Sequence, residues 1–191
     1  MARIDKNSIF ALYKYKYRCT IMDTGFSRSD DVVGQVFRAL REKNATFSSA
    51  ESCTGGNIAH LITLVPGSSE VFVGSVVSYA TRVKTDLLGV PAVTIEKDGV
   101  VSCATASAMA SGVRNLLATD YAVATTGVAG PGGGTEQNPV GTVCIAAASS
   151  DKTVSKRLVF GNDRAENINS ATYEAYRMLL EMINEKTQQR T

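Results

Sequence analysis

Helical and strand-like hydrophobic patterns alternate along most of this 191-residue chain, and this alternation restricts the fold more than any other feature. Residues 27–44 carry apolar side chains at spacings of three and four, which predicts an amphipathic helix. Residues 71–79 (VFVGSVVSY) are β-branched and aromatic, which predicts a buried strand. Such alternation is typical of proteins in which helices cover both faces of a sheet.

The remaining predicted elements continue this order until the last third of the chain. We expect strands at residues 45–51, 121–125, 141–148 and 153–160, and helices at residues 56–65, 82–88, 105–117 and 163–183. The last two strands follow each other without a helix between them, which predicts a hairpin. The sequence therefore predicts an α/β fold, a single-domain three-layer α/β/α sandwich with a mixed, mainly parallel central sheet.

The predicted domain covers residues 26–186, between an N-terminal extension of unknown role (residues 1–25) and a polar tail (residues 187–191). The extension contains a basic and aromatic run at residues 13–18 (YKYKYR), a composition that some nucleic-acid-binding segments share. Because this run is short and lies outside the patterned core, we favour a solvated edge strand or loose arm over a nucleic-acid partner.

Targeting signals are weak in this sequence. No apolar run reaches the length of about 18 residues that spans a bilayer, and the N-terminus has no secretory apolar region, so we expect no membrane partner. The four cysteines, Cys19, Cys53, Cys103 and Cys144, form no C-x-x-C pair, which argues against a zinc site and a disulfide framework. We expect a cytoplasmic protein, with organellar targeting by the basic extension left open.

The turn at residues 48–56 (SSAESCTGG) carries three possible nucleophiles, Ser52, Cys53 and Thr54, just before two glycines. One interpretation is structural, because small hydroxyl residues cap helices and glycine permits tight turns. The other is functional, because unpaired N–H groups at such a turn stabilise a phosphate or a developing oxyanion. The segment alone leaves both interpretations open.

The choice of a general base decides what chemistry this turn could support. The single histidine, His60, follows Ser52 by eight residues, and seven helical residues span roughly 10 Å, too far for a hydrogen bond of ~3 Å. A base, which could be a lysine, a tyrosine or a carboxylate, must then come from another segment. The predicted strand at residues 71–79 ends with Tyr79 and leads to Lys84, and the ends of parallel strands gather at one edge of a sheet. Lys84 could act as a base if burial lowers its pKa from ~10.4 toward about 7 or 8; otherwise it is a solvated helix residue.

A second glycine cluster and one arginine are candidates for ligand binding. Residues 125–134 (TTGVAGPGGG) follow a predicted strand but match neither a dinucleotide fingerprint nor a P-loop, so a ligand loop and a flexible surface loop both remain open. Asp163 and Glu166 have the spacing of a capping box. Arg164 stands between them in the first turn of a helix, where a cation opposes the helix dipole, which favours an anionic ligand nearby.

Four segments together, AESCTGG, GSSEVFVGSVVSYATRVKTDLLGV, TGVAGPGGGTEQNPVGTV and FGNDR, resemble the CinA C-terminal domain family, also known as the PncC-type nicotinamide mononucleotide amidohydrolases. The resemblance runs from about residue 27 to about residue 183. It implies hydrolysis of the carboxamide of nicotinamide mononucleotide to nicotinic acid mononucleotide and ammonia, in pyridine nucleotide recycling, without a metal or organic cofactor. It also implies a homodimer.

The resemblance assigns roles residue by residue. Ser52 is the expected nucleophile, Lys84 the base, and Tyr79 relays or orients the proton, while Cys53 is a packing residue. The expected substrate-binding residues are Thr54 and Gly55 at the turn, Thr126, Gly127, Gly130, Gly132 and Gly133 in the glycine loop, and Arg164. Backbone N–H groups near Thr54 and Gly55 would hold the oxyanion, and the loop and Arg164 would hold the ribose phosphate.

The sequence departs from the family pattern in two places. Tyr79-Ala80-Thr81 stands where Tyr-Ser-Asn is common, and the first 25 residues match nothing in the domain. The larger N-terminal domain of fused CinA proteins is absent, so we expect the stand-alone form. The alternative hypothesis is a catalytically silent module of the same fold that binds a nucleotide or a partner protein.

Overall fold

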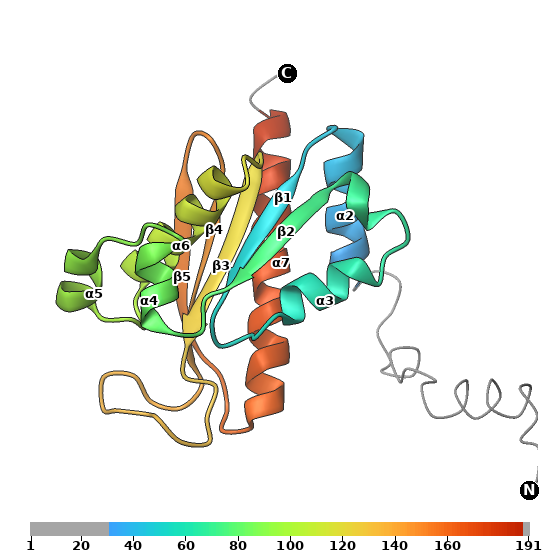
Figure 1. Cartoon of the computed structure of the whole chain (residues 1–191). Helices are drawn as coiled ribbons and strands as arrows, with labels where there is room; N and C mark the ends of the chain where they lie inside the picture. Colours follow the sequence, from blue (N-terminus) through green and yellow to red (C-terminus); the bar gives the residue numbers. More distant parts are fainter. Residues whose placement is uncertain (1–30, 189–191) are drawn as a thin grey trace, which may run out of the picture. The chain divides into compact units, whose positions relative to one another are not determined.

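Five strands form one mixed sheet in the order β2-β1-β3-β4-β5 in this computed structural model, which describes residues 31–188 (Figure 1). The strands are β1 (Phe47–Glu51), β2 (Phe72–Val77), β3 (Tyr121–Gly127), β4 (Thr142–Ala148) and β5 (Thr153–Val159). β1 pairs in parallel with β2 and with β3, whereas β4 is antiparallel to β3 and to β5. The predicted mixed sheet and its late hairpin are confirmed.

Helices cover both faces of the sheet, as the alternating pattern predicts (Figure 1). They are α2 (Val32–Glu42), α3 (Asn57–Thr63), α4 (Thr81–Asp86), α5 (Ala92–Asp98), α6 (Cys103–Leu116) and α7 (Arg164–Gln188), with a short 3₁₀ helix, η2 (Ser68–Glu70), before β2. α7 packs on β3 and β4 beside α2 and α3, and α6 packs on the opposite face with α5. The three-layer sandwich is therefore confirmed.

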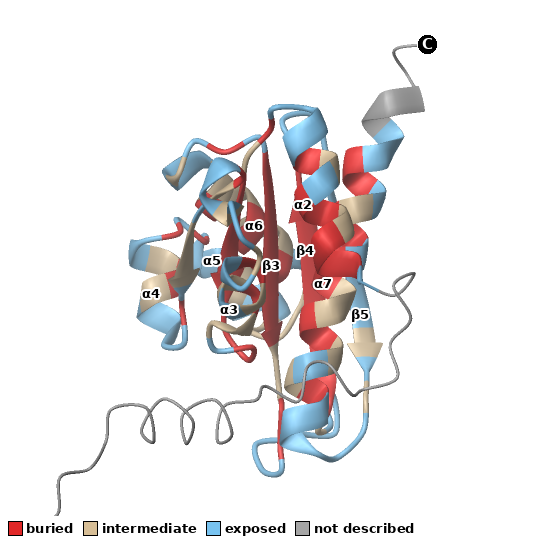
Figure 2. Cartoon of the chain, turned by 90° about the vertical axis from the view of Figure 1, so that its right-hand side faces the viewer, coloured by how far each residue is buried: buried red, intermediate tan, exposed pale blue. Residues whose placement is uncertain are grey.

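The two interfaces between helices and sheet have different side chains. The face under α2 and α7 is filled by large groups such as Phe47, Leu40 and Tyr176. The face under α6 is lined by small residues, among them Ala122 and Ala146, which let the helix approach the strands closely. β3 and β4 lie between the two layers and are almost entirely buried (Figure 2).

Three predicted elements differ from the observed ones. β2 is an edge strand in which every residue is partly or fully exposed, so the prediction of a buried strand is wrong. The apolar composition of residues 71–79 does not reveal that one side of the strand has no neighbouring strand among the described residues. α5 was not predicted, because it buries no residue and so has no apolar stripe. α7 continues past the predicted end at residue 183 through a polar segment.

Some predictions fall on residues that the structure does not describe. The N-terminal extension (residues 1–25) and the first residues of the helix predicted at 27–44 lie outside the described residues. Within residues 31–188, no helix is both long enough and apolar enough to cross a membrane.

Candidate active site

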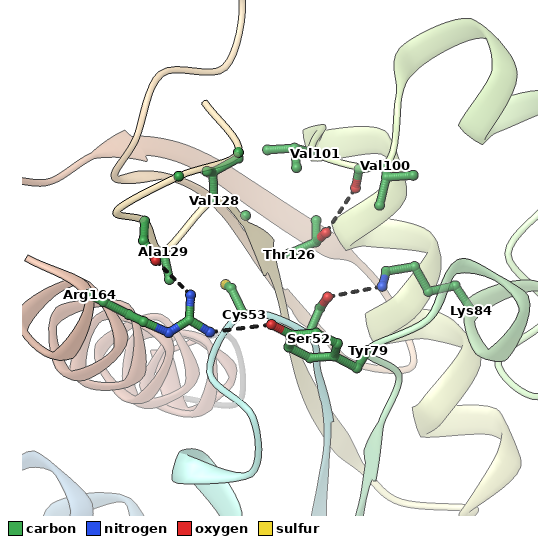
Figure 3. Close-up of a pocket in the computed structure, with 14 residues that line it drawn as sticks. Ser52, Cys53, Tyr79, Lys84, Val100, Val101, Thr126, Val128, Ala129 and Arg164 are labelled. Carbon is green, nitrogen blue, oxygen red and sulfur yellow. Dashed lines mark hydrogen bonds between the residues drawn. The ribbon is translucent and has the colours of Figure 1, made fainter. Parts of the chain in front are cut away.

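A cavity of about 300 Å³ opens where β1, β2 and β3 end, at the carboxyl edge of the parallel part of the sheet (Figure 3). Nine of the predicted site residues line it: Ser52, Tyr79, Lys84, Thr126, Gly127, Gly130, Gly132, Gly133 and Arg164. Thr54 and Gly55 are not among the lining residues. His60 is exposed on α3 and does not line the cavity either.

Ser52 and Lys84 are in direct contact inside this cavity (Figure 3). Nζ of Lys84 lies 3.0 Å from Oγ of Ser52, and it donates a second hydrogen bond of 2.5 Å to the carbonyl of Ser78. The two meet because β1 and β2 are parallel neighbours, with Glu51 opposite Val77, so that the turns following them lie side by side. The arrangement pairs a hydroxyl with an amine at the distance that proton transfer requires.

Burial changes the acid–base properties of Lys84. The side chain is 1% exposed, and this burial lowers the pKa of Lys84 below its ordinary value, while the thiol of Cys53 acts in the opposite direction. A buried ammonium without a carboxylate partner is costly, so the neutral amine is favoured. Lys84 is therefore not the solvated helix residue of the alternative interpretation.

Cys53, the neighbour of Ser52, has the opposite character. Its side chain is 6% exposed and packs in the core under α2 and α7. Burial raises the pKa of this thiol to about 12, although a hydrogen bond with Thr125 and the charge of Lys84 act against the increase. A thiol with so high a pKa stays protonated near neutral pH and is a poor nucleophile.

Tyr79 and Arg164 lie together at the mouth of the cavity (Figure 3). Arg164 donates one hydrogen bond of 2.8 Å to the carbonyl of Gly130 and another of 3.3 Å to the hydroxyl of Tyr79. Tyr79 is 64% exposed. Its observed contact is thus with the Arg164 cation at the mouth of the cavity, and its expected role as a proton relay stays a prediction.

The capping interpretation of the segment before α7 is correct for Asp163, whose Oδ1 accepts a hydrogen bond of 2.9 Å from the N–H of Glu166. α7 begins at Arg164, directly after this cap. The side chain of Arg164 turns to the glycine loop rather than to its own helix. The cation therefore fastens the loop to the start of α7 and faces the cavity at the same time.

The glycine loop is a structured wall of the cavity. A Cβ at Gly127 would meet the carbonyl oxygen of Thr142 at 2.5 Å, so only glycine permits this approach to β4. Gly130 has φ of +90° and precedes a cis peptide bond to Pro131. The close approach at Gly127 holds the start of the loop against β4, and the ligand-loop interpretation stays a prediction.

Asn167 supports the same loop and escaped prediction from the sequence. Its amide donates hydrogen bonds of 2.9 Å to the carbonyls of Ala129 and Gly161. An asparagine in the second turn of a predicted helix gives no signal of such a role.

The segment between α5 and α6 completes the cavity with Val100 and Val101, which were also missed. Thr126 donates a hydrogen bond of 2.8 Å to the carbonyl of Val100 and holds this segment against β3. No strong hydrophobic pattern surrounds the two valines, so only the tertiary structure reveals them as an apolar wall.

The turn after Ser52 offers backbone donors, although not all of those expected. The N–H of Gly55 donates to the carbonyl of Ser52 at 3.2 Å, so it is occupied. The N–H groups of Cys53 and Thr54 have no backbone acceptor among residues 31–188.

Across the same residues, no group of three or more His, Cys, Asp or Glu side chains is placed to hold a metal ion.

Glu51 is the main residue at this turn that the sequence did not single out. Its buried carboxylate accepts hydrogen bonds from the first N–H groups of α3 and from the hydroxyl of Thr54. The side chain of Thr54 therefore points into the turn and hydrogen-bonds to Glu51. The sequence shows only that Glu51 is an acidic residue next to the candidate nucleophile Ser52. The charge of a residue does not predict that its side chain is buried.

Comparison with known proteins gives one consistent family. The family model described as the CinA C-terminal domain matches residues 29–183. A CinA-like protein of Synechococcus sp. strain RCC307 is 50% identical over 122 residues, which is 64% of this chain and 29% of that protein. A CinA-like protein of Cytophaga hutchinsonii is 47% identical over 136 residues, 71% of this chain and 32% of that protein. The chain thus spans about a third of the length of the curated relatives it matches.

Solved structures show the same similarity over nearly their whole length. The competence/damage inducible protein CihA from Agrobacterium tumefaciens is 34% identical with a TM-score of 0.78, and the match covers 81% of this chain and 94% of that one. A CinA superfamily protein from Klebsiella pneumoniae 700603 is 30% identical with a TM-score of 0.78, covering 83% and 99%.

Proposed function

The chain belongs to the CinA C-terminal domain family, and from this premise we propose that it is a nicotinamide mononucleotide amidohydrolase. The proposed reaction converts nicotinamide mononucleotide and water to nicotinic acid mononucleotide and ammonia. A role in pyridine nucleotide recycling in the cytoplasm is part of this proposal.

The observation that carries the proposal is the contact between Ser52 and Lys84. A hydroxyl 3.0 Å from a buried amine of lowered pKa is the arrangement that serine–lysine acyl transfer requires. In the neutral form of Lys84, the Ser52 hydroxyl donates to the lone pair of Nζ, and one amine hydrogen donates to Ser78.

The first half of the proposed reaction forms an acyl-enzyme. Lys84 takes the hydroxyl proton as Oγ of Ser52 bonds to the carboxamide carbon, and the carbonyl oxygen becomes an oxyanion. The C–N bond then breaks, and the leaving nitrogen takes the proton back from Lys84 and departs as ammonia. The N–H group of Cys53, which lines the cavity, is our proposed oxyanion donor, because the N–H of Gly55 is occupied and Thr54 does not line the cavity.

The second half returns the enzyme to its starting state. Water attacks the ester carbon while Lys84 accepts one of its protons, and the bond to Oγ breaks. Lys84 then returns the proton to Ser52. The products are nicotinic acid mononucleotide and a free serine, so no proton is gained or lost by the pair.

Substrate binding divides the cavity into two regions in this proposal. The apolar side chains of Val100, Val101 and Val128 suit the pyridine ring beside Ser52. Arg164 and the N–H groups of the glycine loop suit the phosphate, since a guanidinium recognises phosphate oxygens through paired donors. Binding of the phosphate would compete with the hydrogen bond from Arg164 to Tyr79.

The direct test is turnover of nicotinamide mononucleotide by the purified chain, with both products quantified, beside Ser52→Ala. We expect release of ammonia and nicotinic acid mononucleotide in equal amounts and loss of both in the variant. Saturable binding of the nucleotide without turnover by the parent protein would instead support the catalytically silent module.

A homodimer is also part of the proposal. Leu64, Val73 and Val77 are about half exposed, at 49%, 51% and 47%, and the two valines lie on β2, which within residues 31–188 forms an edge of the sheet. Exposed apolar side chains on an unpaired edge favour association. Light scattering of the parent protein should give twice the mass of the chain, and Val73→Lys should shift it toward the monomer. A monomeric parent would contradict this part of the proposal.

A further inference from the structure

The carboxylate of Glu51 is completely buried immediately before the candidate nucleophile. Its side chain is 0% exposed at the end of β1, and Ser52 is the next residue. A buried carboxylate is strongly destabilising unless hydrogen bonds satisfy its oxygens. The groups that donate hydrogen bonds to Glu51 therefore show which parts of the site its carboxylate holds together.

Backbone N–H groups of the following helix supply most of these donors. Gly56 and Ile58 each donate to Oε2 of Glu51 at 3.0 Å, and Ala59 donates to Oε1 at 2.9 Å. The N–H groups at the start of a helix have no partner within the helix itself. Glu51 thus occupies the start of α3 from inside the protein, so these amides are not available to a phosphate or an oxyanion.

Hydroxyl groups complete the shell and connect it to the neighbouring strands. Thr54 donates to Oε2 at 2.8 Å and contacts the hydroxyl of Thr125 on β3 at 2.8 Å. Ser75 on β2 donates to Oε1 at 3.2 Å. The carboxylate is therefore bonded directly to β2 and to the helix that follows β1, and it reaches β3 only through the hydroxyl of Thr54.

The main chain of Glu51 is part of a closed ring of contacts with the dyad. Its carbonyl accepts a hydrogen bond of 2.8 Å from the N–H of Ser78. The carbonyl of Ser78 accepts from Nζ of Lys84, and Nζ contacts Oγ of Ser52, which is covalently joined to Glu51. Movement of the turn at Glu51 would therefore change the distance between Ser52 and Lys84.

We propose that Glu51 is the positioning residue of this site. Its carboxylate fixes the turn of residues 52–56 so that Ser52 stays within hydrogen-bonding distance of Lys84. The same carboxylate fills the start of α3, which directs an anionic substrate group to the Arg164 end of the cavity. This inference rests on the proposed function where the test measures turnover of nicotinamide mononucleotide. The labelling of Ser52 does not depend on that function.

The main test is Glu51→Gln, which keeps the shape of the side chain but places an NH₂ group opposite N–H donors. Labelling of Ser52 by a fluorophosphonate reports serine reactivity without any nucleotide substrate. We expect the labelling rate of the folded variant to fall about a hundredfold, because misplacement of reacting groups by about 1 Å has an effect of this size. We expect kcat with nicotinamide mononucleotide to fall in parallel while KM stays nearly constant.

Two further variants keep the test decisive. Glu70→Gln is the matched control, because Glu70 is a half-exposed glutamate that pairs with Arg41 away from the cavity, and it should label at the parent rate. If Glu51→Gln does not fold, Thr54→Val removes one donor to the carboxylate at nearly constant volume and should slow labelling in the same direction. Thermal unfolding of each variant shows which of them are folded.

The outcomes separate this inference from the proposed function. Parent-like labelling and kcat in folded Glu51→Gln, or parent-like labelling by Thr54→Val when that variant replaces it, would overturn the positioning role. A change in KM alone would overturn it as well. Fast labelling of the parent that depends on Glu51, together with no hydrolysis of nicotinamide mononucleotide, would support the positioning role and reject the amidohydrolase. An unlabelled parent would overturn both.

Discussion

Nζ of Lys84 lies within hydrogen-bonding distance of Oγ of Ser52, at 3.0 Å, although 32 residues separate them in the chain. The contact depends on the parallel pairing of β1 and β2 and on the burial of an amine that has no carboxylate partner in the contacts described for it. The contact makes Lys84 a possible base for Ser52 and Ser52 a possible nucleophile. Most of the expected outcomes given next depend on this contact.

Lys84→Met should abolish turnover without destabilising the protein. The variant removes the proposed base, and loss of general base catalysis alone reduces rates by about a hundredfold to ten-thousandfold. Because methionine places no charge at a site that is 1% exposed, the melting temperature should stay the same or rise. Kinetics and calorimetry of Lys84→Met beside Arg82→Met, an exposed cation on the same helix, provide the measurement. Substantial turnover by Lys84→Met would rule out lysine as the base.

The pH dependence of turnover should show one ascending limb that belongs to Lys84. Since only the neutral amine accepts a proton, kcat/KM should rise with pH as Lys84 deprotonates and level off below its ordinary pKa of 10.5. A flat profile down to about pH 5 would contradict this assignment.

Stability should respond to the same ionisation. Between the lowered pKa of folded Lys84 and 10.5 the unfolded chain binds the extra proton, so the free energy of unfolding contributed by this residue should increase with pH in that window. Denaturant titrations of the parent and of Lys84→Met, subtracted at each pH, isolate this contribution. A difference that does not change with pH would be inconsistent with a lowered pKa.

Cys53→Ala should leave catalysis almost unchanged and lower stability slightly. A thiol with a pKa of about 12 is protonated at neutral pH, so its loss removes packing but no nucleophile. The lost contacts should reduce the free energy of unfolding by about 1 kcal/mol. Assays with and without a thiol-alkylating reagent give the check, and an inactive but folded Cys53→Ala would return Cys53 to consideration as the nucleophile.

Tyr79→Phe separates two roles for this hydroxyl. If it acts through Arg164, as its 3.3 Å contact suggests, the variant should change KM several-fold and leave kcat nearly constant. If it relays the proton between Ser52 and Lys84, kcat should fall and KM should change little. Steady-state kinetics decide between the two, with Tyr173→Phe on α7 as a tyrosine control away from the cavity.

Ala80→Ser should stabilise the helix that carries Lys84. Ala80 is the N-cap of α4 and makes no side-chain hydrogen bond there, and a serine at an N-cap contributes about 1 kcal/mol relative to alanine. We expect a higher melting temperature with unchanged KM. An unchanged melting temperature would show that the departure from Tyr-Ser-Asn is neutral for stability.

The hydrophobic pattern was sufficient to predict the layered fold, whereas the pairing of Ser52 with Lys84 was assigned only by the resemblance to the family. Apolar periodicity reports which face of an element is buried, and the position of the only histidine excluded the usual base. It did not show that β2 is an edge strand, because apolar composition does not reveal whether a strand has one neighbour or two. It also missed Glu51 and the pair Val100 and Val101, since a buried carboxylate and a short apolar pair in a loop have meaning only once distant segments meet.

The position of β2 at the edge of the sheet has a consequence for how the protein loses activity. Ser52 follows a strand that is bonded on both sides, whereas Tyr79 and Lys84 follow a strand that, in the part of the chain the structure describes, is bonded on one side only. Edge elements open locally at lower free energy than central ones. On warming, the amine should therefore separate from the hydroxyl before the rest of the sheet melts, and heat inactivation should begin several degrees below the cooperative transition.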